Sequence, residues 1–73
     1  MQSLYSGQQA ILNKAIAFDP QNASAYFLRA KIKRRLNDMY GECSDYKQLA
    51  LLGIQQTAQW LRSDSGAWCR NMR

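Results

Sequence analysis

The 73-residue sequence contains no histidine, a single proline, four isolated glycines and five acidic residues. Without histidine, the chain lacks the side chain that most often serves as a general base. The scattered acids suggest no catalytic carboxylate pair, and isolated glycines do not form a phosphate-binding loop. We therefore expect a protein that is not an enzyme and has no cofactor or metal.

Long apolar runs are also absent, and the N-terminus lacks the basic start and continuous apolar stretch of a secretory signal. These absences predict a soluble protein of a reducing, cytoplasmic compartment, alone or attached to a larger complex. Any membrane contact would be peripheral at most.

The two cysteines, Cys43 and Cys69, form no metal or redox motif. Cys43 falls on the apolar side of a predicted helix, where its simplest role is that of a small buried hydrophobic residue. The sequence allows a disulfide between the two cysteines without indicating one.

Local signals divide the chain into helices. Asp19-Pro20 ends a first helix over 4–18, because proline cannot continue it. Asn22 can cap a second helix over 23–36 by accepting a hydrogen bond from a free backbone amide.

The turn Asn37-Asp38 separates this helix from a third one over 39–52, with Asp38 as its cap. Gly53 is suited to end the third helix in a left-handed conformation. The connections are short, so consecutive helices should pack antiparallel.

Each predicted helix has one apolar side at a spacing of 3.6 residues. In 4–18 this side holds Tyr5, Leu12, Ala15 and Ile16, flanked by Ile11 and Phe18, while Gln9 and Asn13 face away. In 23–36 it holds Ala25, Leu28, Ile32 and Leu36, with Tyr26 and Ala30 beside them. In 39–52 it holds Met39, Cys43, Tyr46, Leu49 and Ala50.

The C-terminal segment 55–73 is expected to cap this arrangement. Thr57 can cap a fourth helix that runs through Leu61, and Ile54 and Trp60 would lie against the third helix. The tail 67–73 is interpreted as a further helical turn, with ordering by a partner as the alternative.

The spacing of several residues resembles the tetratricopeptide repeat, a helix-turn-helix unit of 34 residues. Tyr26 falls at the family's first aromatic position and Ala30 at its small residue. Leu36-Asn37-Asp38 resembles its turn, Asp45-Tyr46 its second-helix pair, and 14–20 the ending of a repeat. The resemblance covers residues 4–53, as the last helix of one repeat and one complete repeat.

The resemblance implies one all-α domain over 1–73, with antiparallel helical hairpins stacked as a short superhelix. Its parts would be 4–18, the complete repeat 23–53 and the capping segment 55–73. It also implies an ion pair between Arg29 and Asp45. Glu42 departs from the family by replacing a small residue at the closest helix–helix approach, so Gly41 or Cys43 would make that contact instead.

The net charge is +5, and five cations lie between residues 29 and 35 without an acid among them. One side of this helix holds Ser24, Phe27, Lys31, Arg34 and Arg35. In the family that the chain resembles, this side binds peptides. Cations beside a phenyl ring suit an acidic protein segment with an apolar side chain. We therefore expect an adaptor, assembly factor or small accessory subunit that binds another protein there.

Three alternatives remain. The cations can simply solvate a helix surface. A nucleic-acid binder would use them on phosphates, although no base-reading motif is present. A self-associating structural subunit would use the N-terminal helix, through Tyr5 and Ile11, to form a homo-oligomer.

Overall fold

The computed structural model describes the backbone of residues 2–72 and the side chains of residues 7–72. Over this range the regular secondary structure is helical, without strands, which confirms the predicted all-α class. In chain order the elements are α1 (Gln2–Phe18), α2 (Ala23–Arg35), α3 (Met39–Leu51), α4 (Gln55–Arg62), the 3-10 turn η1 (Asp64–Gly66) and α5 (Ala67–Arg70). No helix in this range combines the length and the apolar character needed to cross a bilayer.

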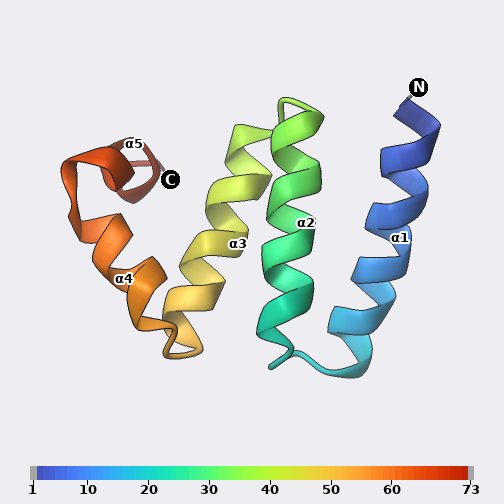
Figure 1. The fold of residues 1–73 in the computed structure, drawn as a ribbon, viewed down its shortest axis with the longest axis horizontal. Helices are drawn as coiled ribbons and strands as arrows, with labels where there is room; N and C mark the ends of the chain where they lie inside the picture. Colours follow the sequence, from blue (N-terminus) through green and yellow to red (C-terminus); the bar gives the residue numbers. More distant parts are fainter. Residues whose placement is uncertain (1, 73) are drawn as a thin grey trace.

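The main helices lie side by side in the order of the sequence. Figure 1 shows α1 to α4 as a row in which the chain reverses direction at each turn. α2 packs between α1 and α3, and α4 packs on the far side of α3. Within the described part of the chain, α1 contacts no other element than α2.

The predicted helix boundaries are confirmed to within two residues for α1, α2 and α3. The Asn22 side chain accepts a hydrogen bond from the Ala25 amide at 3.2 Å, and Asp38 accepts one from the Gly41 amide at 2.9 Å. Gly53 has a φ of +91°, as expected for a helix end in the left-handed region. Asn37 also has a positive φ, of 60°, which asparagine tolerates better than most residues.

The core lies between α2, α3 and the C-terminal segment. Its buried side chains include those of Ala25, Tyr26, Ala30, Ile32, Cys43, Leu49 and Cys69. Four apolar residues predicted for these apolar sides or their flanks are largely exposed instead: Phe18 at 94%, Ile11 at 68%, Met39 at 51% and Leu28 at 50%. Phe18 ends α1 and Met39 begins α3, so both stand at chain reversals, and Leu28 faces the joint between α1 and α2.

Helix α3 lies close to α2 at Gly41, one of the two residues predicted for the helix–helix contact. A β-carbon at Gly41 would meet the Lys33 side chain at 2.7 Å and would also collide with the Asp38 carboxylate. Glu42 is nevertheless buried, with 3% of its surface exposed, and accepts a hydrogen bond from the Tyr46 hydroxyl at 3.1 Å. A charged residue is tolerated there because its carboxylate has partners.

The fourth helix begins earlier than predicted. Ile54, rather than Thr57, occupies its N-cap position and provides no side-chain hydrogen bond. Thr57 lies inside α4 and is buried, so its predicted capping role is wrong. Trp60 packs edge-on against Tyr46 of α3, with ring centroids 5.1 Å apart, and Trp68 packs against Trp60 at 5.9 Å. These rings hold the C-terminal segment on α3, and the predicted turn in the tail is present as α5.

Cys43 and Cys69 form a disulfide that links α3 to α5, with their Cα atoms 5.3 Å apart. Cys43 is buried, as predicted, but it is bonded to Cys69 rather than serving simply as a small hydrophobic residue. The sequence did not indicate this bond because only the folded path of the tail brings the two residues within bonding distance. The disulfide gives no support to the expected reducing compartment, and the cytoplasmic location stays a prediction.

Candidate interaction surface

The residues predicted to bind a partner lie along α2, but they differ in exposure. Ser24, Lys31, Arg34 and Arg35 are exposed, whereas Phe27 is only partly exposed. The ring of Phe27 is therefore not the free apolar anchor that we expected.

The cations of α2 separate into two groups according to their acidic neighbours. Arg29 pairs with Asp45 of α3 through both carboxylate oxygens, at 3.1 Å from Nε and 2.6 Å from Nη2. Lys33 Nζ lies 3.5 Å from the same carboxylate, and Arg34 Nε lies 3.8 Å from Glu42. These three cations compensate the two buried acids of α3.

Lys31 and Arg35 form the second group. All five acids of the chain lie within residues 7–72, and in this range none forms an ion pair with either cation. Arg34 is intermediate, because its side chain remains 77% exposed despite its contact with Glu42. The free positive charge of α2 is therefore concentrated at Lys31 and Arg35, which lie one helical turn apart.

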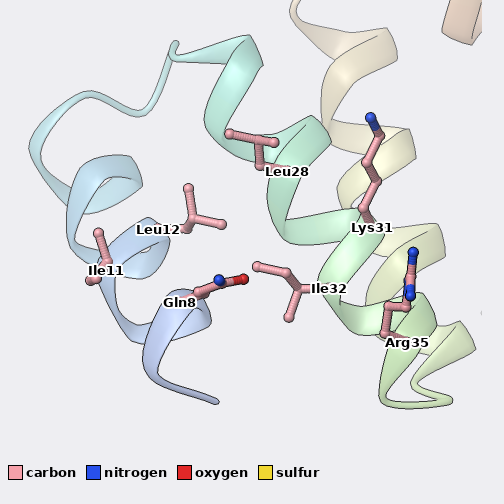
Figure 2. A pocket seen from close by; sticks show the side chains of 7 residues that line it. All are labelled: Gln8, Ile11, Leu12, Leu28, Lys31, Ile32 and Arg35. Carbon is pink, nitrogen blue, oxygen red and sulfur yellow. The ribbon is translucent and has the colours of Figure 1, made fainter. Parts of the chain in front are cut away.

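A groove of about 430 Å³ runs along the joint between α1 and α2. It is lined by Gln8, Ile11, Leu12, Leu28, Lys31, Ile32 and Arg35. Figure 2 shows Leu12, Leu28 and Ile32 between the two helices, with Lys31 and Arg35 along α2. We call this feature the α1–α2 groove; it has apolar walls and a cationic rim.

The structure brings together two of the five predicted residues, Lys31 and Arg35, in this groove. Ser24, Phe27 and Arg34 do not line it. The sequence interpretation missed the role of Leu28, which it assigned to the core, and of Ile11, which it placed on the flank of a packed face. Ile32 was correctly assigned to the core and also lines the groove. Periodicity gave the correct side of each helix, but it could not show that this side stays open at the joint.

A second, smaller hollow of about 220 Å³ lies over α3 and the tail. It is lined by Tyr40, Cys43, Ser44, Lys47, Gln48, Leu51 and Met72. Its one cation is already engaged, because Lys47 Nζ donates a hydrogen bond to the Met72 carbonyl. The α1–α2 groove is larger and retains free charge, so it is the better candidate for a binding site.

The charged and polar groups on the opposite side of α2 stabilise the fold. The hydrogen bonds from Arg29 to Asp45 raise the pKa of the guanidinium above its already high ordinary value, so Arg29 stays charged. Burial, together with the hydrogen bond to Glu42, raises the pKa of Tyr46 above 10.0. Asn13 of α1, predicted to face away, accepts a hydrogen bond from Arg29 at 2.9 Å, so Arg29 connects three helices.

No protein-family model, curated protein or solved structure matches the chain. The tetratricopeptide resemblance therefore stays a prediction. The α1–α2 groove and the two cations on its rim are the features that bear on function.

Proposed function

We propose that the chain is a non-enzymatic protein-interaction module that binds an acidic segment of another protein through the α2 side of the α1–α2 groove. Such a module serves as an adaptor, assembly factor or small accessory subunit. The observation that carries this proposal is the position of Lys31 and Arg35, unpaired within the described residues, on the rim of an apolar groove.

The chemistry of the rim favours a carboxylate-bearing partner. Arg35 can bind a carboxylate through two parallel hydrogen bonds, and Lys31 adds a second positive charge one turn away. The apolar anchor that we first assigned to Phe27 is provided instead by the groove, where Ile11 and Leu28 are 68% and 50% exposed. Covering these side chains would remove apolar surface from water and so favour binding.

We further propose that the hairpins belong to a superhelical arrangement of the tetratricopeptide type. Support comes from Tyr26 and Ala30, which fall at the family's aromatic and small positions and are buried with 6% and 0% exposure. The ion pair between Arg29 and Asp45, which the resemblance implied, is also present.

The proposed function can be tested by partner capture from cell extract, followed by mass spectrometry. The test variant combines Lys31→Gln with Arg35→Gln, which removes two charges from the rim. Arg34 is left in place because it compensates the buried Glu42. The control is Arg62→Glu, which changes the net charge by the same amount at an exposed position on α4.

We expect the rim variant to lose specific acidic partners that both the parent and Arg62→Glu retain, while circular dichroism shows unchanged helix content. Equal capture by all three proteins would contradict the proposed function.

Nucleic-acid binding is the first alternative to be distinguished from binding of an acidic protein segment. Three of the five α2 cations already pair with Asp45 or Glu42, which leaves few for phosphates. A gel-shift with unrelated DNA and RNA at low and moderate salt would reveal this alternative as affinity that falls steeply with salt.

Self-association is the other alternative. The Tyr5 side chain lies outside the described residues, and Ile11 belongs to the groove wall. Light scattering over a dilution series tests self-association directly, and a monomer at every concentration would remove it.

A further inference from the structure

We infer that the partner segment is an amphipathic α-helix that lies in the α1–α2 groove as an additional helix, with two acidic residues one turn apart facing Lys31 and Arg35. This inference depends on the proposed function and specifies the partner's conformation and pattern. It commits the groove to a foreign acidic helix and excludes both an extended peptide and a second copy of this chain.

The dimensions of the groove fit a short helical contact. On α2 the lining residues run from Leu28 to Arg35, a rise of about 10.5 Å at 1.5 Å per residue. A helix with apolar residues at positions i, i+3, i+4 and i+7 presents an apolar stripe of about the same length. About two turns of a partner helix would therefore cover the exposed faces of Ile11 and Leu28.

The composition of the walls favours a helix over an extended segment. Apart from the two cations, the only polar side chain that lines the groove within the described residues is that of Gln8. The backbones of α1 and α2 are occupied by their own hydrogen bonds, so an extended peptide would bury amides and carbonyls without partners. A helix satisfies these groups internally and can present apolar side chains alone.

The charges argue for a partner of different sequence. The chain carries a net charge of +5, so two copies repel each other. Asp45 and Glu42 are buried and paired, and the exposed acids Asp19, Asp38 and Asp64 are too far apart in the chain to present two carboxylates one helical turn apart. By contrast, two acidic residues four positions apart on a partner helix are separated by an axial rise of about 6 Å, the same rise that separates Lys31 from Arg35 on α2.

The test uses synthetic peptides and fluorescence anisotropy with the full chain. The first peptide has leucines at i, i+3, i+4 and i+7 and two glutamates four residues apart beside this stripe. The second is the same peptide with one central residue changed to proline, which breaks the helix and keeps the acids and leucines. The third replaces both glutamates by glutamine.

We expect the first peptide to bind and the other two to bind about tenfold more weakly or not at all. On the protein side, Ile11→Gln should weaken binding of the first peptide by a similar factor because it removes apolar groove wall. Leu51→Gln is the matched control, since Leu51 is 80% exposed on α3 and lies outside the groove. It should bind as the parent does.

The outcomes distinguish the two proposals. Equal affinity for the first and second peptides, or no effect of Ile11→Gln, would overturn the helical partner and leave an acidic partner in place. If the first peptide fails to bind while acidic partners are captured through Lys31 and Arg35, the proposed function stands and this inference fails. Equal affinity for the first and third peptides would overturn the proposed pairing of the two acidic residues with Lys31 and Arg35.

Discussion

Arg29 holds Asp45 with two hydrogen bonds across the interface between α2 and α3, while its third nitrogen donates to Asn13 of α1. Asp45 is almost completely buried, with 1% of its surface exposed. The guanidinium of Arg29 also lies 5.4 Å from the centroid of the Tyr26 ring. One side chain thus connects the three helices that form the groove and its support.

Removing this guanidinium should therefore cost much of the stability. We expect Arg29→Met to lower the free energy of unfolding by about 3 kcal/mol, because Asp45 would remain buried with Lys33 as its one cation. Lys33→Met, which leaves the two-point pair intact, should cost about 1 kcal/mol. Urea titration followed by circular dichroism would measure both losses. Equal losses would contradict the expectation that Arg29 stabilises Asp45 more than Lys33 does.

The disulfide should contribute by limiting the freedom of the unfolded chain. Cys43 and Cys69 are 26 positions apart, and a loop of this length corresponds to about 3.5 kcal/mol in the chain-entropy model. We expect the double variant Cys43→Ala with Cys69→Ala to lose stability of this order. Tryptophan fluorescence during urea unfolding would report it, because Trp60 and Trp68 belong to the segment that the disulfide holds.

Reduction of the parent protein by an excess of dithiol should produce the same shift as the double variant, which provides an internal control. An unfolding midpoint that neither treatment changes would show that the aromatic packing alone fixes the C-terminal segment.

Tyr46 should make stability depend on pH in the alkaline range. Burial and the hydrogen bond to Glu42 raise its pKa above 10.0, so the folded state favours the neutral phenol. Its contribution is complete below pH 10 and is lost as the pH rises through the raised value. Tyr46→Phe should therefore flatten the alkaline fall in stability.

Urea unfolding at a series of alkaline pH values would test this, with tyrosinate absorbance to follow ionisation. Tyr46→Phe should also cost about 1 kcal/mol at neutral pH because Glu42 loses a donor. Parallel pH profiles for the variant and the parent would refute the role of Tyr46.

Gly66 should tolerate no side chain. A β-carbon there would collide with the carbonyl of Trp60 and lie 2.9 Å from the Cα of Leu61, and both obstacles are backbone. We expect Gly66→Ala to lower stability by about 2 kcal/mol. Gly7→Ala is the control, because no neighbouring atom lies within 4 Å of its β-carbon and the helix should gain about 0.5 kcal/mol. Thermal unfolding would test whether Gly66→Ala lowers the stability while Gly7→Ala raises it.

The sequence predicted the local structure well because its signals act over a few residues. Pro20, Asn22, Asp38 and Gly53 each determine a helix end through their own backbone or side chain. The ion pair of Arg29 was predicted correctly from the resemblance. The packing of Trp60 on the third helix was also predicted correctly. The disulfide was not predicted, because the path of the tail depends on the packing of Trp68 against Trp60, which no local pattern encodes.

The candidate site was predicted only in part for the same reason. The charge run drew attention to α2, but the sequence could not show that Asp45 and Glu42 neutralise some of its cations. It also could not separate apolar residues that pack from those left at an open joint. Lys31 and Arg35 were found from charge, whereas Ile11 and Leu28 required the relative placement of two helices.

The position of α1 at the end of the row has a consequence for how the molecule responds to a ligand. Among the elements that the structure describes, α1 packs on α2 alone, and it lies outside the covalent ring closed by Cys43 and Cys69. Local opening should therefore begin there, and backbone amides of α1 should exchange with deuterium sooner than those of α3. A ligand that contacts both walls of the groove would slow this exchange. The protection of the α1 amides would therefore increase with the fraction of protein that has ligand bound.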